Sequence, residues 1–162
     1  MNIFVLDPDP VAAARLHCDR HVVKMPLEAA QILCTALHLH GVATTYKPTH
    51  AGHPCVRWAA ETRSNFRWLA IHGLALVEEH GIRYAHTAAG RRGHASKAVL
   101  LEAAGLAGSI PDGPLTPFEL VMPASMRGPD PVASYRRYYA AEKSAIATWR
   151  SPRTRPSWMD GE

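Results

Sequence analysis

Apolar residues recur at helical spacing along most of the chain, and the residues between them mark helix ends. A first helix is predicted over residues 10–16, because Asp9 is followed by a proline at the first helical position. A second helix is predicted from Asp19, as its cap, to residue 40, just before a glycine. Pro26 interrupts this second pattern, so that helix either kinks or starts again there.

The remaining apolar patterns predict further helices over residues 54–84, 97–106 and 131–149, separated by loops rich in proline, glycine and histidine. Residues 2–6 form a short apolar run that favours a strand. The prediction is an all-α fold: a single compact bundle of five or six helices with at most one short N-terminal strand.

Length and composition set the size and class of the protein. With 162 residues, 47% of them hydrophobic and 20% charged, one globular domain is expected, and disorder of the whole chain is ruled out. We place the helical domain at residues 1–149 and an extended basic tail at residues 150–162. The net charge of +4 and the pI of about 9.2 favour a polyanionic partner.

The expected location is the cytoplasm. No apolar stretch approaches the roughly 18 residues of a membrane span, and the first residues lack the features of a secretory signal. Three cysteines (Cys18, Cys34 and Cys55) are too few for a disulfide framework, which favours a reducing compartment.

A stripe of unlike polar residues follows the second predicted helix. His17, His21, Lys24, Glu28 and Gln31 are spaced so that a continuous helix would place all five on one face. The simplest interpretation is a solvated face. However, such a face usually carries Lys and Glu pairs, whereas this one combines proton donors, acceptors and an ammonium group. A reactive pocket is the alternative.

A second group of reactive side chains lies in the loop before residue 54. His50 and His53 are close in sequence to Cys55, and all three can bind metals. Neither an HExxH nor a paired CxxC motif is present, so the zinc signal is weak. We therefore expect no metal or other cofactor, and expect this loop to close a polar pocket beside the stripe.

The last predicted helix and the start of the tail are basic and aromatic. Arg136, Arg137, Tyr138, Lys143 and Arg150 combine positive charges with a ring, which suits a phosphate backbone and stacked bases. The same pattern is typical of an ordinary soluble surface helix, and both interpretations remain open.

Several short segments together resemble a small all-helical family associated with bacteriophages. That family is similar to the helical domain that accompanies 5-hydroxymethyluracil DNA kinases. The resemblance extends over nearly the whole chain, and the segment at residues 17–25 is its most specific part. The segments are Met1–Asp7, Asp9–Pro10, His17–Met25, Thr49–His50, His53–Cys55, Ser64–Phe66, Trp68–Leu69, Thr116–Phe118, Met122–Pro123, Asp130–Val132, Tyr135–Arg136, Tyr138–Tyr139 and Lys143.

The resemblance implies a phage-type protein that acts on DNA or nucleotides and modifies or processes a pyrimidine base. It places the protein in the host cytoplasm if phage-encoded, with a base-modification kinase or hydroxymethylase as an expected partner. The chain itself has no phosphate-binding GxxxxGK[ST] motif and is not such a kinase.

We expect an enzyme, with base-modifying transferase or glycosylase-like activity on DNA. In this hypothesis the basic residues hold phosphate, and His17, His21, Lys24, Glu28, His50 and His53 line the reactive pocket. A non-catalytic nucleic-acid-binding module that accompanies base-modification enzymes is the first alternative. A metal-dependent hydrolase is the second.

Overall fold

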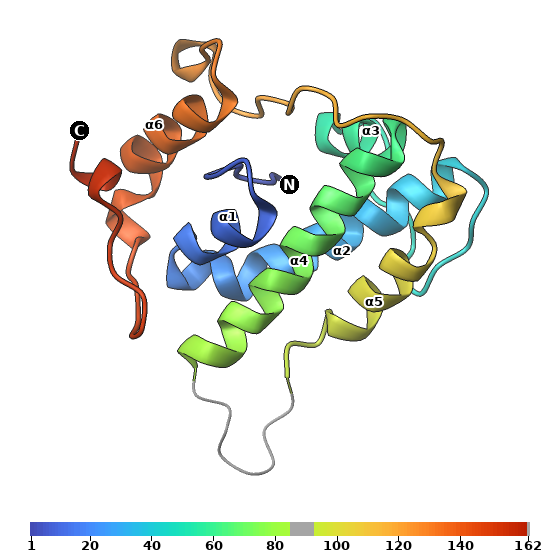
Figure 1. The fold of residues 1–162 in the computed structure, drawn as a ribbon, viewed down its shortest axis with the longest axis horizontal. Helices are drawn as coiled ribbons and strands as arrows, with labels where there is room; N and C mark the ends of the chain where they lie inside the picture. The colour runs from blue at the N-terminus through green and yellow to red at the C-terminus, as the bar shows by residue number, and fades with distance from the viewer. Residues whose placement is uncertain (85–92, 162) are drawn as a thin grey trace.

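The computed structural model describes residues 1–84 and 93–161. Within these ranges the chain forms α-helices and short 3₁₀ turns but no strand, which confirms the predicted all-α fold (Figure 1). None of the described helices is long and apolar enough to cross a membrane. The helices are α1 (Pro10–Leu16), α2 (Asp19–Leu39), α3 (Pro54–Glu61), α4 (Arg63–Arg83), α5 (Lys97–Gly105) and α6 (Pro131–Lys143).

Helix α4 is central, because it packs against α1, α2, α3 and α5. The helices approach one another closely at Gly73 of α4. A Cβ at this position would lie 2.8 Å from Cδ2 of Leu100 and 3.1 Å from Cβ of Ala29. Only glycine therefore lets α2, α4 and α5 meet at this distance, and their apolar faces form one buried core.

The helix predicted over residues 54–84 is divided in two at Thr62. This residue has an extended backbone, and its hydroxyl accepts a hydrogen bond from the amide of Asn65 at 3.2 Å. It also donates to the carbonyl of Pro114 at 2.9 Å. Thr62 is thus the N-cap of α4, and the prediction of one continuous helix was wrong because the apolar pattern continues across the break.

Helix α2 differs from the prediction at its start and agrees over its length. Cys18 is the residue before the first turn, and Asp19 is the first helical residue instead of the cap. The helix is continuous through Pro26. His17 caps the C-terminus of α1, so the five-residue polar stripe does not belong to one helix.

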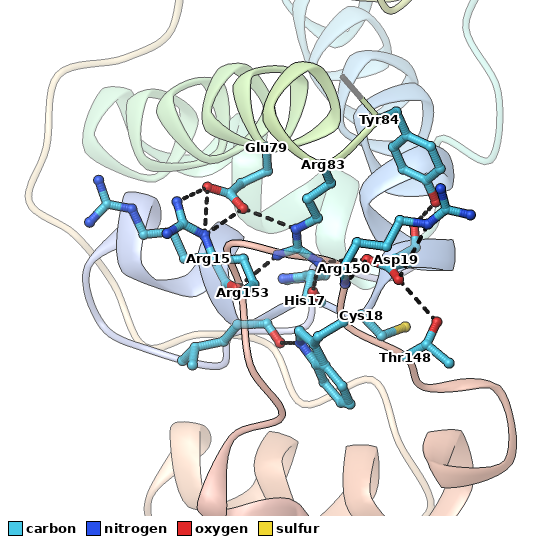
Figure 2. A network of polar contacts seen from close by, with 12 residues as sticks. Arg15, His17, Cys18, Asp19, Glu79, Arg83, Tyr84, Thr148, Arg150 and Arg153 are labelled. Carbon is cyan, nitrogen blue, oxygen red and sulfur yellow. Dashed lines mark hydrogen bonds and ion pairs between the residues drawn. The ribbon is translucent and has the colours of Figure 1, made fainter. Parts of the chain in front are cut away.

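The last helix is shorter than predicted, because α6 ends at Lys143 instead of residue 149. The chain then turns back and packs on α1, α2 and α4 (Figure 2). The amide of Asp19 donates to the carbonyl of Thr148 at 2.8 Å, and the indole of Trp149 donates to that of Leu16 at 3.1 Å. In the predicted tail, the amide of Arg150 donates to Asp19 at 3.1 Å and the guanidinium of Arg153 donates to Glu79 at 2.9 Å, so its first residues are also anchored to the helical core.

The N-terminal segment, residues 1–9, lies between α6 and the other helices (Figure 1). Ile3, Val5 and Leu6 are buried, as the apolar run predicts. This segment forms no strand, since no described segment pairs with it. This buried segment therefore lies between α2 and α6 and separates the two helices.

Candidate functional site

The polar face of α2, the N-terminal segment and α6 enclose a hollow of about 270 Å³, which we call the Glu28 pocket. It combines three of the residues predicted to be catalytic with two of those predicted to bind nucleic acid. Its lining is Met1, Asn2, Phe4, His21, Lys24, Met25, Glu28, Val121, Tyr138 and Lys143.

An ion pair between Lys24 and Glu28 lies in this pocket, with Nζ 2.9 Å from Oε1. The two residues are one helical turn apart on α2, which directs them to the same side. The ammonium side chain is 68% exposed, whereas the carboxylate side chain is only 11% exposed. The second carboxylate oxygen, Oε2, accepts a hydrogen bond from the amide of Asn2 at 3.0 Å. The carboxylate is thus fixed in place, and the ammonium group reaches outward.

His21 forms an aromatic group with the residues that surround it. Its ring stacks on Phe4 with centroids 4.7 Å apart and meets Tyr139 edge-on at 5.1 Å. Burial, together with the nearby ammonium of Lys143 and against the opposing effect of Glu28, lowers the pKa of His21 to about 4. The His21 imidazole is therefore uncharged at neutral pH, and it is suited to hydrogen bonding with an uncharged ligand.

Lys143 brings a second ammonium group to the pocket from the end of α6. Its Nζ lies 5.1 Å from the ring centroid of Tyr138 and 6.0 Å from that of Phe4. The two rings are nearly parallel, with an interplanar angle of 10°. This wall therefore offers both a cation and aromatic surface to a ligand.

Asn2 and Phe4 complete the pocket, and the sequence interpretation missed both. Phe4 has φ of 41°, a left-handed conformation that costs a bulky residue free energy. The side-chain oxygen of Asn2 accepts from the amides of Ile3 at 2.7 Å and Phe4 at 3.1 Å, and its amide group donates to Val121 at 2.8 Å. An asparagine before an apolar run is a recognised signal for such a local turn.

His17 lies behind the pocket and does not line it. The residue is fully buried, and its Nδ1 hydrogen-bonds the carbonyl of Ala13 at 2.8 Å. Its ring centroid is 6.0 Å from that of His21 and 5.1 Å from that of His72. Burial and the neighbouring histidines lower the pKa of His17. The structure therefore places it in the core, in contact with a pocket residue.

The two loop histidines are near the pocket but outside its lining. Nδ1 of His53 accepts from the amide of Cys55 at 3.2 Å and so caps α3. Burial lowers the pKa of His53, and Glu28 is close enough to oppose this shift. His50 is exposed, has φ of 51° and hydrogen-bonds Thr49 at 2.7 Å.

The residues predicted to bind nucleic acid are divided between three places. Tyr138 and Lys143 line the Glu28 pocket. Arg136 and Arg137 line a separate hollow of about 590 Å³ between α6 and Trp158. Arg150 belongs to the network in Figure 2: its guanidinium lies 4.7 Å from the Tyr84 ring centroid and its amide donates to Asp19 at 3.1 Å.

The metal-binding side chains of the described residues do not assemble into a metal centre. Among residues 1–84 and 93–161, no three histidine, cysteine, aspartate or glutamate side chains are arranged to hold a metal ion. The three cysteines are free and buried, so the loop of His50, His53 and Cys55 does not assemble as a ligand set.

Residues 1–90, more than half of the chain, match the family model described as pyrimidine dimer DNA glycosylase. This range contains α1 to α4 and therefore His21, Lys24 and Glu28. It ends before α6, which supplies Tyr138 and Lys143. No curated protein and no solved structure matches the chain.

Proposed function

Because the chain belongs to the pyrimidine dimer DNA glycosylase family, we propose that it cleaves the bond between a pyrimidine and its deoxyribose in the Glu28 pocket. The observation that carries this proposal is the Lys24–Glu28 ion pair of 2.9 Å, placed beside a neutral histidine and two aromatic rings. Amine, carboxylate and base-stacking surface are the groups that this reaction uses.

The role of Glu28 follows from the charge that develops during cleavage. As the glycosidic bond lengthens, the sugar becomes positively charged and the departing pyrimidine becomes negatively charged. A carboxylate that is already oriented by Asn2 stabilises the sugar without further reorganisation. The same group lies within hydrogen-bonding distance of the Lys24 amine and accepts its proton.

Lys24 supplies the nucleophile. After passing a proton to Glu28, its amine attacks C1′, the bond from C1′ to the pyrimidine breaks, and the bond electrons leave with the base, which takes the proton back from Glu28. The adduct nitrogen then gives one proton to the Glu28 carboxylate, its lone pair forms the C1′=N bond as the C1′–O4′ bond breaks, and O4′ takes that proton, which leaves a protonated imine. Borohydride reduces such an imine to a stable protein–DNA link, which makes this step directly testable.

The basic residues of α6 hold the DNA. Lys143 lies at the pocket, where it neutralises a phosphate next to the reacting nucleotide. Arg136 and Arg137 lie outside the pocket and extend the contact along the backbone. A displaced base stacks on the partly exposed ring of Tyr138, which Phe4 supports from behind.

The substrate includes hypermodified as well as damaged pyrimidines, with 5-hydroxymethyluracil as the modified base to test first. This part of the proposal rests on the resemblance to the phage-associated family. A base hydroxymethylase or kinase that acts on the same DNA is the corresponding partner.

The test is base release from duplex and single-stranded DNA that contains a pyrimidine dimer, 5-hydroxymethyluracil or unmodified thymine, with and without borohydride. We expect release and a trapped adduct on at least one modified substrate. Lys24→Ala abolishes the adduct, Glu28→Gln lowers turnover about 100-fold or more, and His21→Ala lowers turnover while binding is kept. Arg20→Ala is the matched control, because this exposed residue of α2 does not line the pocket.

Full turnover in both Lys24→Ala and His21→Ala would overturn the pocket assignment. A trapped adduct that persists in Lys24→Ala would move the nucleophile to another amine. Binding without base release from any of the substrates would instead favour the non-catalytic nucleic-acid-binding module.

A further inference from the structure

A second hollow follows the Glu28 pocket along α2, and the proposed cleavage does not use it. We call it the Tyr46 pocket. It has a volume of about 470 Å³ and is lined by Leu27, Gln31, Thr45, Tyr46, Lys47, Pro48 and Thr49. Lys24 and Glu28 line the first pocket and Leu27 and Gln31 the second, a spacing that places all four on one face of α2. The two sites are therefore consecutive.

The distance between the two pockets fits neighbouring nucleotides. Averaged over the α2 residues that line them, the two pockets are about four to five residues apart, or about 7 Å along the helix axis at 1.5 Å per residue. Successive nucleotides of one DNA strand are about 3.4 Å apart when stacked, and further apart when unstacked. A strand that places one base in the Glu28 pocket thus brings the next to the Tyr46 pocket.

The lining of the Tyr46 pocket has the groups that a nucleotide requires. The side-chain amide of Gln31 has no hydrogen-bond partner among the described residues, and glutamine amides pair with base edges. Tyr46 and the 41%-exposed Leu27 supply flat and apolar surface for a base. Lys47 is exposed and has no ion pair within the described residues, so its ammonium is available to a phosphate.

The segment that forms the outer wall is held in place from both sides. The amide of Thr49 donates to the hydroxyl of Thr35 on α2 at 3.1 Å. At the other end, the amide of Thr45 donates to Glu102 of α5 at 3.0 Å. The pocket is therefore formed before a ligand arrives, which removes the entropic cost of ordering it.

We infer that the Tyr46 pocket binds the undamaged nucleotide next to the reacting pyrimidine on the same strand, with Gln31 on the base edge and Lys47 on the phosphate. This inference deepens the proposed function and rests on it. Its consequence is that the protein reads the neighbouring base, so that recognition depends on sequence context.

The test is the affinity of the full chain for fluorescent duplexes that carry a pyrimidine dimer with either a natural nucleotide or a tetrahydrofuran abasic analogue beside it. We expect the abasic analogue on one side of the dimer to weaken binding about tenfold, the value of one lost stacking contact. Gln31→Ala and Tyr46→Ala bind the natural duplex as weakly as the abasic one. Lys47→Ala weakens both equally, and the exposed Lys97→Ala serves as the control.

The inference is overturned if the wild-type protein binds the natural and abasic duplexes equally well, with the analogue on either side of the dimer. It is also overturned if Gln31→Ala and Tyr46→Ala still prefer the natural duplex as strongly as the wild type does. Circular dichroism confirms that each variant is folded. Base release that is independent of the neighbour refutes only this inference. A difference in affinity between the natural and abasic duplexes, without base release, refutes only the glycosylase proposal.

Discussion

The guanidinium of Arg83 donates through Nε to the carboxylate of Glu79 at 3.1 Å, and both side chains are at most 4% exposed. Arg83 also contacts Asp19 at 3.3 Å and donates to the carbonyls of His17 at 2.6 Å and Arg15 at 2.8 Å (Figure 2). One buried cation therefore ties together the ends of α1, α2 and α4. The same carboxylate of Glu79 accepts from Arg153, so the C-terminal segment joins this network.

Replacement of Arg83 by methionine is expected to destabilise the protein strongly. The change leaves Glu79 and Asp19 with fewer partners in the core, and breaking such a buried pair costs about 3–5 kcal/mol. Urea unfolding measures the difference in the free energy of unfolding. Arg67→Met on the exposed side of α4 is the control, with a change below about 0.5 kcal/mol. A loss of similar size in both variants would contradict the role of the network.

Stability is expected to fall as the pH drops from about 6.5 towards 4, because His72 is buried and neutral in the folded protein. Burial lowers its pKa from 6.5 to about 4. In this window the unfolded chain binds the proton and the folded one does not, so protonation favours unfolding; above pH 6.5 the contribution is complete. The shift corresponds to about 3 kcal/mol at 1.36 kcal/mol per pKa unit.

His72→Asn tests this linkage, because asparagine does not titrate and still carries a hydrogen-bond donor. Its free energy of unfolding should depend less steeply on pH than that of the wild type between pH 6.5 and 4. Part of the pH dependence of the free energy of unfolding remains in this variant, because burial also lowers the pKa values of His17 and His21. An unchanged slope in the variant would contradict the prediction.

Two glycines of α4 should respond oppositely to alanine. At Gly73 the added methyl group would meet Leu100 and Ala29 within 3.1 Å, so overpacking should cost about 1–3 kcal/mol. At Gly81 nothing lies within 4 Å, and the better helix propensity of alanine should add about 0.5–1 kcal/mol. Thermal unfolding of both variants measures the contrast, and stabilisation by Gly73→Ala would show that the helices are not in such close contact.

Lys143→Ala should weaken binding to all DNA duplexes and reduce its dependence on salt. The slope of log K against log salt should fall by about 0.9, the value for one lost phosphate contact. Titrations at several salt concentrations, with Lys97→Ala as the control, measure this change. Lys143 makes no ion pair among the described residues, so the loss of its cation–π contact with Tyr138 should lower the free energy of unfolding by at most about 1 kcal/mol. An unaltered slope would exclude a phosphate contact.

The sequence was sufficient for the all-α class, for the positions of most helices and for the shared polar face of Lys24 and Glu28 on α2. Helix α1 matches its prediction residue for residue, since Asp9 and Pro10 are local signals that need no tertiary partner. Lys24 and Glu28 are one turn apart in the sequence, so their pairing follows from helical geometry. Thr62 shows the limit: its capping role was hidden within a continuous apolar pattern.

The composition of the site was decided by contacts between distant segments. Phe4 and Tyr138 come from opposite ends of the chain, and their stacking needs the N-terminal segment to lie between α2 and α6. His17 appeared equivalent to His21 in spacing, yet the end of α1 places it in the core. Similarly, Arg136 and Lys143 carry like charges on one helix but face different hollows.

Local sequence thus determined most of the helices and the pairing of Lys24 with Glu28, because periodicity and capping act within a few residues. Only the tertiary structure decided which imidazole borders the pocket, which cations surround it, and that a second hollow continues from it. Those properties depend on how the chain ends pack over the helical core, and a short-range pattern carries no information about contacts between residues more than a hundred positions apart.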